Sequence, residues 1–227
     1  MAQTLRLKAF LFEERERYGE IISSAEEVYK ECFVQRALVE ERNISEDSRR
    51  WTTRDKEKIE NFSQAYDIIL HGQGEVNIAY LQVLHTLVMK NLLPNAGHFR
   101  TKPARPAKDA SVWYSSPGLI ALQLKTLCQQ VAQEKEERVT AAARFLVFFL
   151  SIHPFSNGNG RVARLAIARL LMEDTVYPIR LKRIGSEAYA SMLNTARITG
   201  HLEELKKYIQ ESMEESIRFA CFLLDIQ

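Results

Sequence analysis

The most informative stretch of the sequence is Val139-Thr-Ala-Ala-Ala-Arg-Phe-Leu-Val-Phe-Phe-Leu-Ser-Ile152, followed directly by His153-Pro-Phe-Ser-Asn-Gly-Asn-Gly-Arg161. The first part is apolar on nearly every face of a helix, with Arg144 as its only charge, and such a helix belongs in the middle of a bundle. A second, largely apolar run extends from Val162 to Met172. The sequence therefore predicts two buried helices joined by a short polar turn.

This turn concentrates groups that bind anions. Gly158 and Gly160 permit positive φ and close approach of a ligand, and the second helix begins near Gly160, so its free N–H groups face the turn. Arg161 and Arg164 project from roughly one face of that helix. His153 can accept a proton at neutral pH, because the unperturbed pKa of histidine is about 6.5. Together these groups indicate transfer of a phosphorus-centred group, catalysed by positioning and charge neutralisation.

Helical spacing of apolar residues recurs on both sides of this stretch. A segment rich in proline and glycine, residues 94–118, interrupts it. Within that segment Ser111–Tyr114 is β-prone and could form one strand of a small hairpin. We find no repeat and no linker, so we expect one mostly helical domain. The other helices are expected at about 5–42, Glu57–Leu70, Glu75–Asn91 and Leu205–Ala220.

Composition excludes several classes of protein. The 227 residues are 46% hydrophobic and 26% charged, which is sufficient for a sizeable core. A net charge of +2 gives no electrostatic reason to expect nucleic acid or an anionic membrane as a partner. No run of 18 apolar residues and no signal-peptide core is present. The three separated cysteines are typical of reduced thiols in an intracellular protein, so we expect a cytoplasmic location.

The segment His153–Arg164, HPFSNGNGRVAR, closely resembles the signature of the Fic family, HxFx(D/E)GNGRxxR, and matches seven of its eight defined positions. The likeness extends to Leu84-His85 and Gly97–Arg100, which resemble the family's H…GxxR stretch. It implies a mainly α fold, a Fic/Fido-like helical bundle with a small β-hairpin flap. It also implies an N-terminal helical extension, residues 1–56, and one compact catalytic domain, residues 57–227.

The activity implied by this resemblance is transfer of AMP from ATP to a Ser, Thr or Tyr hydroxyl of a target protein. His153 would be the general base. Phe155 would be a structural anchor for the loop. Gly158, Asn159 and Gly160 would form an anion hole for the α- and β-phosphates. Arg161 and Arg164 would hold the β- and γ-phosphates. ATP is thus the expected co-substrate and a protein the expected partner, and a homo-oligomer is left open.

Asn157 departs from the pattern, because the family usually has Asp or Glu there to help hold Mg²⁺. An amide oxygen can ligate Mg²⁺ or Mn²⁺ but brings no negative charge, so binding should weaken. Three outcomes stay open: slower transfer with the metal held mainly by the nucleotide, a changed metal or nucleotide preference, or a binding module with little activity. We favour the first.

Further roles carried over from the resemblance concern the nucleoside, the target and regulation. Tyr189, Leu193 and Arg197 are the nearest equivalents of the base-binding residues, although ordinary helix packing explains the first two equally well. Val112, Trp113 and Tyr114 would dock a target segment by strand addition. Glu27, in Ser23-Ser-Ala-Glu-Glu27, fits the inhibitory pattern (S/T)xxxE(G/N) loosely and would pair with Arg164. It could instead orient a water for removal of AMP.

Two further stretches match the inhibitory pattern imperfectly, and a second function remains open for the whole chain. Glu41-Arg42-Asn43 and Thr53…Glu57 are further imperfect matches to the inhibitory pattern. For the whole chain, a catalytically weak or inactive nucleotide- or protein-binding module is the second hypothesis. Asn157 favours that module and the intact His153 opposes it. A DNA-binding role for residues 160–173 fits poorly, because that helix is apolar on most faces.

Overall fold

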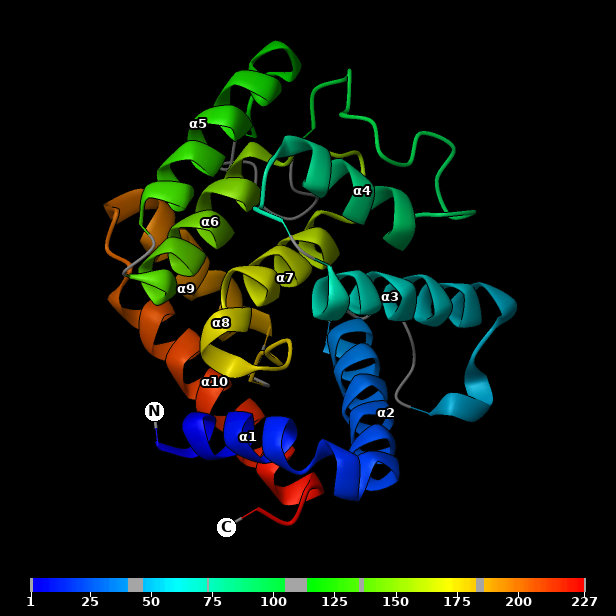
Figure 1. The fold of residues 1–227 in the computed structure, drawn as a ribbon. Coiled ribbons are helices and arrows are strands. Elements are labelled where there is room, and N and C mark those ends of the chain that lie inside the picture. The colour runs from blue at the N-terminus through cyan, green and yellow to red at the C-terminus, as the bar shows by residue number, and fades with distance from the viewer. Residues whose placement is uncertain are drawn as a thin grey trace.

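The computed structural model describes residues 2–40, 47–72, 74–104, 114–134, 137–182 and 186–226. Over these residues the chain is a helical bundle (Figure 1). In chain order its α-helices are α1 Ala2–Glu13, α2 Arg15–Glu40, α3 Thr53–His71, α4 Ile78–Val88, α5 Ile120–Gln133, α6 Arg138–Ile152, α7 Asn159–Leu170, α8 Met172–Thr175, α9 Ser186–Thr199 and α10 Glu203–Leu223. Short 3₁₀ turns lie at Ser48–Arg50 and Pro117–Leu119.

Helix α7 lies at the centre of the bundle and packs against α6, α4, α3 and α2 (Figure 1). Most of its side chains are buried, and Leu165 and Ile167 have no exposed surface. Each such side chain contributes about 1.5–3 kcal/mol when it leaves water. The apolar run that begins at Val162 is therefore explained by burial of most faces of α7, as the sequence predicts.

Helix α6 is the second buried helix, and it packs between α5 and α7. Its core residues include Phe145 and Phe149, whose rings stack with centroids 5.2 Å apart. The single charge of the run, Arg144, forms an ion pair with Glu134 at 2.8 Å. The predicted helix over residues 139–152 thus coincides with α6 almost residue for residue.

The N-terminal helices share the core of the rest of the chain. Helix α1 packs on α10, and α2 packs on α3, α7 and α10. The buried hydroxyl of Tyr29 donates a hydrogen bond to the carbonyl of Pro178 at 2.9 Å, and Arg36 pairs with Glu215 at 2.7 Å. The expected boundary between residues 56 and 57 falls inside α3, which begins with a capping box formed by Thr52 and Asp55.

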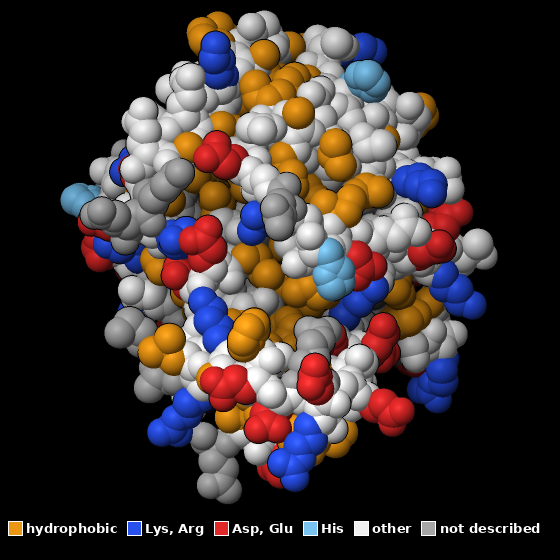
Figure 2. All heavy atoms as spheres, in the orientation of Figure 1, with side chains coloured by type: hydrophobic (Ala, Val, Ile, Leu, Met, Phe, Trp, Pro, Cys, Tyr) orange, Lys and Arg blue, Asp and Glu red, His pale blue; other side chains and the backbone are white. Residues whose placement is uncertain are grey.

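The predicted β-hairpin flap is not confirmed, because the described residues contain no β-strand. Two of its three expected docking residues, Val112 and Trp113, lie outside the described residues, and Tyr114 is the first residue after them. None of the helices in the described part of the chain combines the length and apolar character that crossing a membrane requires. On the face shown in Figure 2, charges of both signs are interspersed around exposed hydrophobic side chains.

Candidate active site

The candidate site is built on the turn between α6 and α7. His153 ends α6 in the left-handed conformation, with φ 50° and ψ 61°, and its N–H donates to the carbonyl of Phe149 at 2.9 Å. Gly158 precedes α7 with φ 77°. A Cβ there would lie 2.7 Å from the sulfur of Met89, so glycine is required on two counts. The left-handed conformation is costly at His153, so the surroundings must hold it.

Phe155 and Asn159 hold the turn in place. The Phe155 ring is completely buried. The Asn159 side chain accepts a hydrogen bond from the Phe155 N–H at 3.0 Å and donates one to its carbonyl at 2.8 Å. The amide side chain of Asn159 is thus occupied within the turn. In the expected anion hole, Asn159 would therefore contribute its backbone N–H at the first position of α7.

His85 supports the same turn, in a role that the sequence alone did not predict. Its ring stacks on Phe155 with centroids 3.8 Å apart and an interplanar angle of 3°. Its Nδ1 accepts the N–H of Gly97 at 2.7 Å, so Nε2 carries the proton and donates to the carbonyl of Asn157 at 3.1 Å. Burial lowers the pKa of His85 to about 4, which keeps this ring neutral. The resemblance marked both His85 and Gly97, but no local pattern shows that they pair.

A cavity of about 430 Å³ opens over the turn and the start of α7. It brings together the predicted general base His153, the glycine-rich turn, both arginines of the signature, and Tyr189, which is predicted to bind the nucleobase. Its lining is Leu150, His153, Ser156, Asn157, Gly158, Asn159, Gly160, Arg161, Arg164 and Tyr189. Free N–H groups at the start of a helix and nearby guanidinium groups make this cavity suited to an anion.

Two predicted base-binding residues do not line this cavity. Leu193 is partly buried against the core, and the guanidinium of Arg197 donates to the side-chain oxygen of Asn194 at 3.0 Å. Both lie on α9, one and two turns beyond Tyr189. The structure therefore places Tyr189 at the cavity and leaves the other two further along the same helix.

Among the described residues that line the cavity, His153 is the only histidine, and its surroundings keep it neutral. Burial lowers the pKa of His153 to about 4, with the charge of Arg100 acting in the same direction and a backbone hydrogen bond to Leu150 partly opposing it. The ring of Tyr114 stacks on the imidazole with centroids 3.9 Å apart. A neutral imidazole can accept a proton, which is the state a general base needs.

The two arginines of the signature differ in accessibility. Arg161 is buried, and its Nη1 donates to the carbonyl of Val88 at the end of α4, at 3.3 Å. Arg164 is partly exposed, and its guanidinium carbon lies 5.8 Å from the centroid of the Tyr189 ring. Of the two, Arg164 is the better placed to meet a ligand, and the buried charge of Arg161 adds to the positive potential of the turn.

The residues present do not fit a metal ion held by the protein itself. The side-chain oxygen of Asn157 accepts the N–H of Gly158 at 2.7 Å, so one of its acceptor sites is occupied. Among the described residues no group of three or more His, Cys, Asp or Glu side chains could hold a metal. Mg²⁺ prefers charged oxygen ligands, and a single neutral amide oxygen beside arginines does not supply them.

The structure does not bring the predicted inhibitory residue to its partner. Glu27 is exposed on α2, and among the described residues it forms no ion pair with Arg164. Arg164 instead shares a small hollow with Phe33, Arg36 and Ala37. Ala37 lies ten residues beyond Glu27, about 15 Å further along the helix. Of the two alternatives, Glu41 lies outside the described residues and Glu57 lies on α3.

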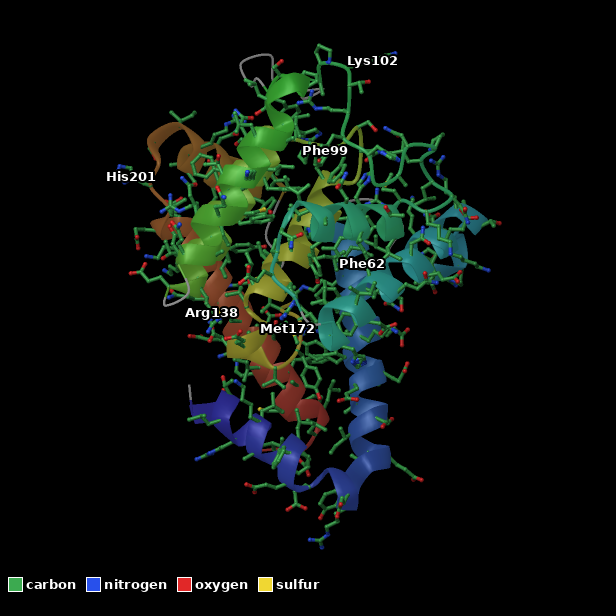
Figure 3. All side chains as sticks on the ribbon, turned by 45° about the horizontal axis from the view of Figure 1, so that its top comes forward. Phe62, Phe99, Lys102, Arg138, Met172 and His201 are labelled. Atoms are coloured by element: carbon green, nitrogen blue, oxygen red, sulfur yellow. The ribbon has the colours of Figure 1, made fainter. Side chains whose placement is uncertain are left out.

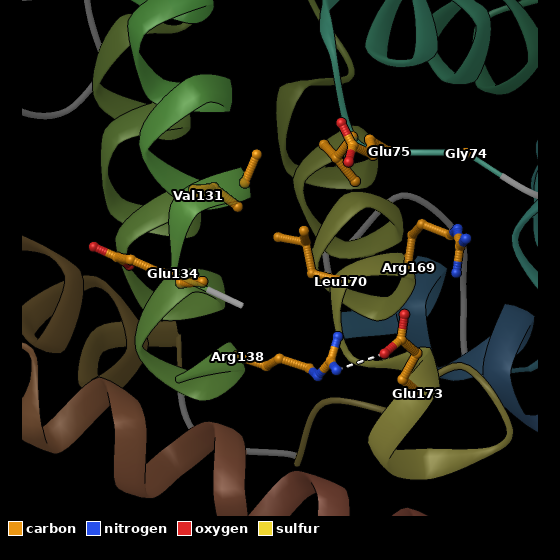
Figure 4. A pocket seen from close by; sticks show the side chains of 11 residues that line it. Gly74, Glu75, Val131, Glu134, Arg138, Arg169, Leu170 and Glu173 are labelled. Atoms are coloured by element: carbon orange, nitrogen blue, oxygen red, sulfur yellow. Dashed lines mark ion pairs between the residues drawn. The ribbon is translucent and has the colours of Figure 1, made fainter. Parts of the chain in front are cut away.

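A second cavity, of about 350 Å³, lies at the opposite ends of α6 and α7 (Figure 4). In Figure 3 Phe99, whose ring contacts Phe155 of the turn, is labelled well above Arg138, which lines the second cavity. Charged side chains at its edge pair with each other: Arg138 contacts Glu173 at 2.5 Å and Asp174 at 3.4 Å. It holds none of the signature residues, so the cavity beside His153 is the candidate active site.

Comparison with known proteins agrees with this fold. Residues 75–171 match the Fic/DOC family. This match identifies a Fic/DOC domain in that part of the chain. It is similar to protein adenylyltransferase fic-1 of Caenorhabditis elegans, with 29% identity over 151 residues, which cover 63% of this chain and 28% of that protein. The chain thus matches little more than a quarter of the length of this curated relative.

Solved structures show the same fold. A Fic domain containing signaling protein from Bacteroides thetaiotaomicron superimposes with a TM-score of 0.79 and 16% identity, and the match covers 99% of both chains. BepC from Bartonella tribocorum, solved with bound AMPPNP, gives a TM-score of 0.58 and 18% identity, covering 69% of this chain and 84% of that one.

Proposed function

We propose that this protein is a nucleotidyltransferase that moves AMP from ATP to a Ser, Thr or Tyr hydroxyl of a target protein. The observation that carries the proposal is the cavity in which His153, the N-terminus of α7 and Arg164 meet. The fic-1 relative is named a protein adenylyltransferase, and the BepC structure contains an ATP analogue. Both similarities support a nucleotide as the ligand of this cavity.

The reaction requires one proton transfer and one displacement at phosphorus. The target hydroxyl oxygen attacks the α-phosphorus, and His153 accepts the hydroxyl proton. The bond from the α-phosphorus to the bridging oxygen of the β-phosphate breaks, and pyrophosphate leaves. N–H groups of the turn and the guanidinium of Arg164 stabilise the charge that develops on the phosphates. A positioned general base contributes about 10²–10⁴ in rate.

The remaining parts of the proposal concern the nucleoside and the target. Tyr189 lies at the cavity and offers a ring face for the base, with Leu193 and Arg197 continuing the same helix. The target segment would enter beside Tyr114, whose ring covers His153. We propose adenine as the base, because an ATP analogue is bound by the similar BepC.

A divalent ion would accompany the nucleotide and share the charge of its phosphates. Because the protein's own donor set is poor, we propose that the phosphates hold this ion and that Asn157 contributes at most one oxygen. Transfer should then be slow and should require high concentrations of Mg²⁺ or Mn²⁺. A nucleotide-binding module with little activity is the competing function, and the occupied side-chain oxygen of Asn157 is the observation that favours it.

Autoinhibition by the N-terminal helices is also part of the proposal. Helix α2 passes beside Arg164 at Phe33 and Ala37, so an inhibitory carboxylate belongs near or after this end of α2 rather than at Glu27. Glu41 follows Ala37 by four residues in the sequence. It is the candidate that we carry forward.

The experiment incubates the protein with ATP labelled at the α- or the γ-phosphate, with Mg²⁺ or Mn²⁺ and a cell extract as a source of targets. AMP transfer predicts protein-bound label from the α position alone, lost in His153→Ala. His201→Ala is the matched control, because His201 is an exposed histidine away from the cavity. Nucleotide binding without label under all conditions would overturn the transferase and favour the module.

A further inference from the structure

The ring of Tyr114 covers one face of the proposed catalytic imidazole. The Tyr114 and His153 rings lie 3.9 Å apart with an interplanar angle of 7°, so they are almost parallel and in contact. His153 also lines the cavity, so the same side chain contacts Tyr114 and borders the space proposed for the ligand. A ring held in this way cannot rotate without losing the stack, and one face is shielded from water.

A single arginine fixes the geometry of this stack from behind. Arg100 is buried, and its Nε donates to the carbonyl of His153 at 2.7 Å. Its Nη2 donates to the carbonyl of Ser115, next to Tyr114, and to that of Ile152 at 3.3 Å. The backbone N–H of Arg100 donates to the carbonyl of Pro154 at 2.9 Å. One residue therefore attaches the chain beside Tyr114 to the end of α6.

We propose that Tyr114 is a positioning residue that holds the imidazole of His153 in its working orientation, and that Arg100 sets the separation of the two rings. This inference rests on the proposed function of His153 as a general base. A base must lie within about 3 Å of the hydroxyl proton that it accepts, and small misplacements cost large factors in rate. A stacked ring restrains the imidazole without using either of its nitrogens.

The surroundings of the stack show how it acts. Burial raises the pKa of the Tyr114 hydroxyl, so it stays protonated at neutral pH and is not itself the base. Among the described residues, the charged and titratable groups near the pair are Arg100, Arg197 beside the tyrosine, and Arg161, Arg164 and Tyr189, which line the same cavity as His153. All the charged ones are cationic, so water reaching an unstacked imidazole would be the main new influence on its pKa, and hydration raises it.

Two substitutions separate the ring from the hydroxyl. Tyr114→Phe keeps the stacked ring, and Tyr114→Leu replaces it with a smaller aliphatic side chain. Phe222→Leu is the matched control, because it removes an exposed aromatic ring at the far end of α10. NMR of the imidazole C2–H, assigned with His153→Ala, gives the ring-current shift and the pKa of His153. Initial rates with labelled ATP give kcat and KM.

The expected results follow from the stack. Tyr114→Phe should keep the upfield C2–H shift and the low pKa of His153, with kcat within about threefold of the wild type. Tyr114→Leu should lose the upfield shift and raise the pKa of His153 toward 6.5. It should also lower kcat at least tenfold, with KM for ATP little changed. Unchanged NMR signals and kcat in Tyr114→Leu would overturn the inference. If the wild-type protein transfers no AMP, the proposed function fails, and the NMR arm still tests the stack.

Discussion

His153 combines a strained backbone with an imidazole whose proton affinity is low in the absence of substrate. Its left-handed conformation turns the ring out of α6 and toward the start of α7. Burial and the charge of Arg100 favour the neutral ring. A bound triphosphate would add negative charge beside the imidazole, and negative charge raises the pKa of a neighbouring base. The base would thus become stronger only when the nucleotide is present.

This reasoning predicts two different acid limbs in the pH profile. The neutral imidazole is the active form, so activity is lost as pH falls through the pKa of His153. The limb of kcat/KM reports the free enzyme and should lie well below pH 6.5, because the pKa is about 4. The limb of kcat reports the nucleotide complex and should lie at higher pH. Initial rates between about pH 4 and 8 measure both. Coinciding limbs near 6.5 would contradict the prediction.

Gly158 is the residue of the turn whose replacement the structure judges most directly. We expect Gly158→Ala to destabilise the protein by more than about 1–2 kcal/mol, the cost of the left-handed conformation alone, because its Cβ also contacts Met89. Gly200→Ala is the matched control, with φ +74° and no atom near the added Cβ. Urea denaturation measures both free energies of unfolding. Equal losses in the two variants would show that the Met89 contact is unimportant.

At the scale of elements, the sequence predicts the parts of the site that depend on local patterns. The apolar runs determine α6 and α7, and the glycines between them fix the turn. The contacts of His85 with Gly97 and of Arg100 with Ser115 join segments 12 and 15 residues apart. No periodicity encodes such contacts, so the supporting residues of the site emerge only in the folded chain. The position of Arg164 relative to α2 likewise depends on packing between distant segments.

The position of α2 gives a test of autoinhibition. Glu27 is exposed and lies well before the point at which α2 meets Arg164, so Glu27→Gly should leave transferase activity within about twofold, apart from the cost of about 0.5–1 kcal/mol for glycine in a helix. Glu41→Gly should raise activity if its carboxylate blocks the phosphates. Label incorporation at several ATP concentrations measures both variants. A rise in transferase activity in Glu27→Gly alone would indicate that Glu27 is the inhibitory residue, as the sequence predicts.

At the scale of the whole molecule, the N-terminal helices and the signature helices form a continuous core. Composition and helical periodicity were sufficient to predict a mainly helical bundle, but they did not show that α1 and α2 bury Leu7, Ile22 and Tyr29 against the remainder. A charge-rich helix reveals its buried face only when its partners are known. The boundary placed between residues 56 and 57 reflects where the resemblance begins, whereas the packing crosses it.

The two low-pKa imidazoles make the stability of this core depend on pH. His85 and His153 have a pKa of about 4 in the folded chain, against about 6.5 when unfolded. Between these values the unfolded chain binds the additional protons. The contribution of the neutral imidazoles to the free energy of unfolding is therefore fully present above about pH 6.5 and is lost as pH falls toward 4. For a fully buried imidazole such as His85 the loss is about 1.4 kcal/mol per pH unit.

His85→Gln isolates the contribution of the buried ring, because glutamine offers a donor and an acceptor but does not titrate. We expect this variant to be less stable than the wild type at pH 7, since the stack on Phe155 is lost. Its free energy of unfolding should nevertheless fall less steeply than that of the wild type between pH 6.5 and 4. The difference in slope corresponds to about one proton fewer taken up on unfolding. Urea denaturation at several pH values across this range measures the slope. A slope equal to that of the wild type would mean that His85 is already protonated in the folded protein, and its hydrogen bond from Gly97 could not then exist as described.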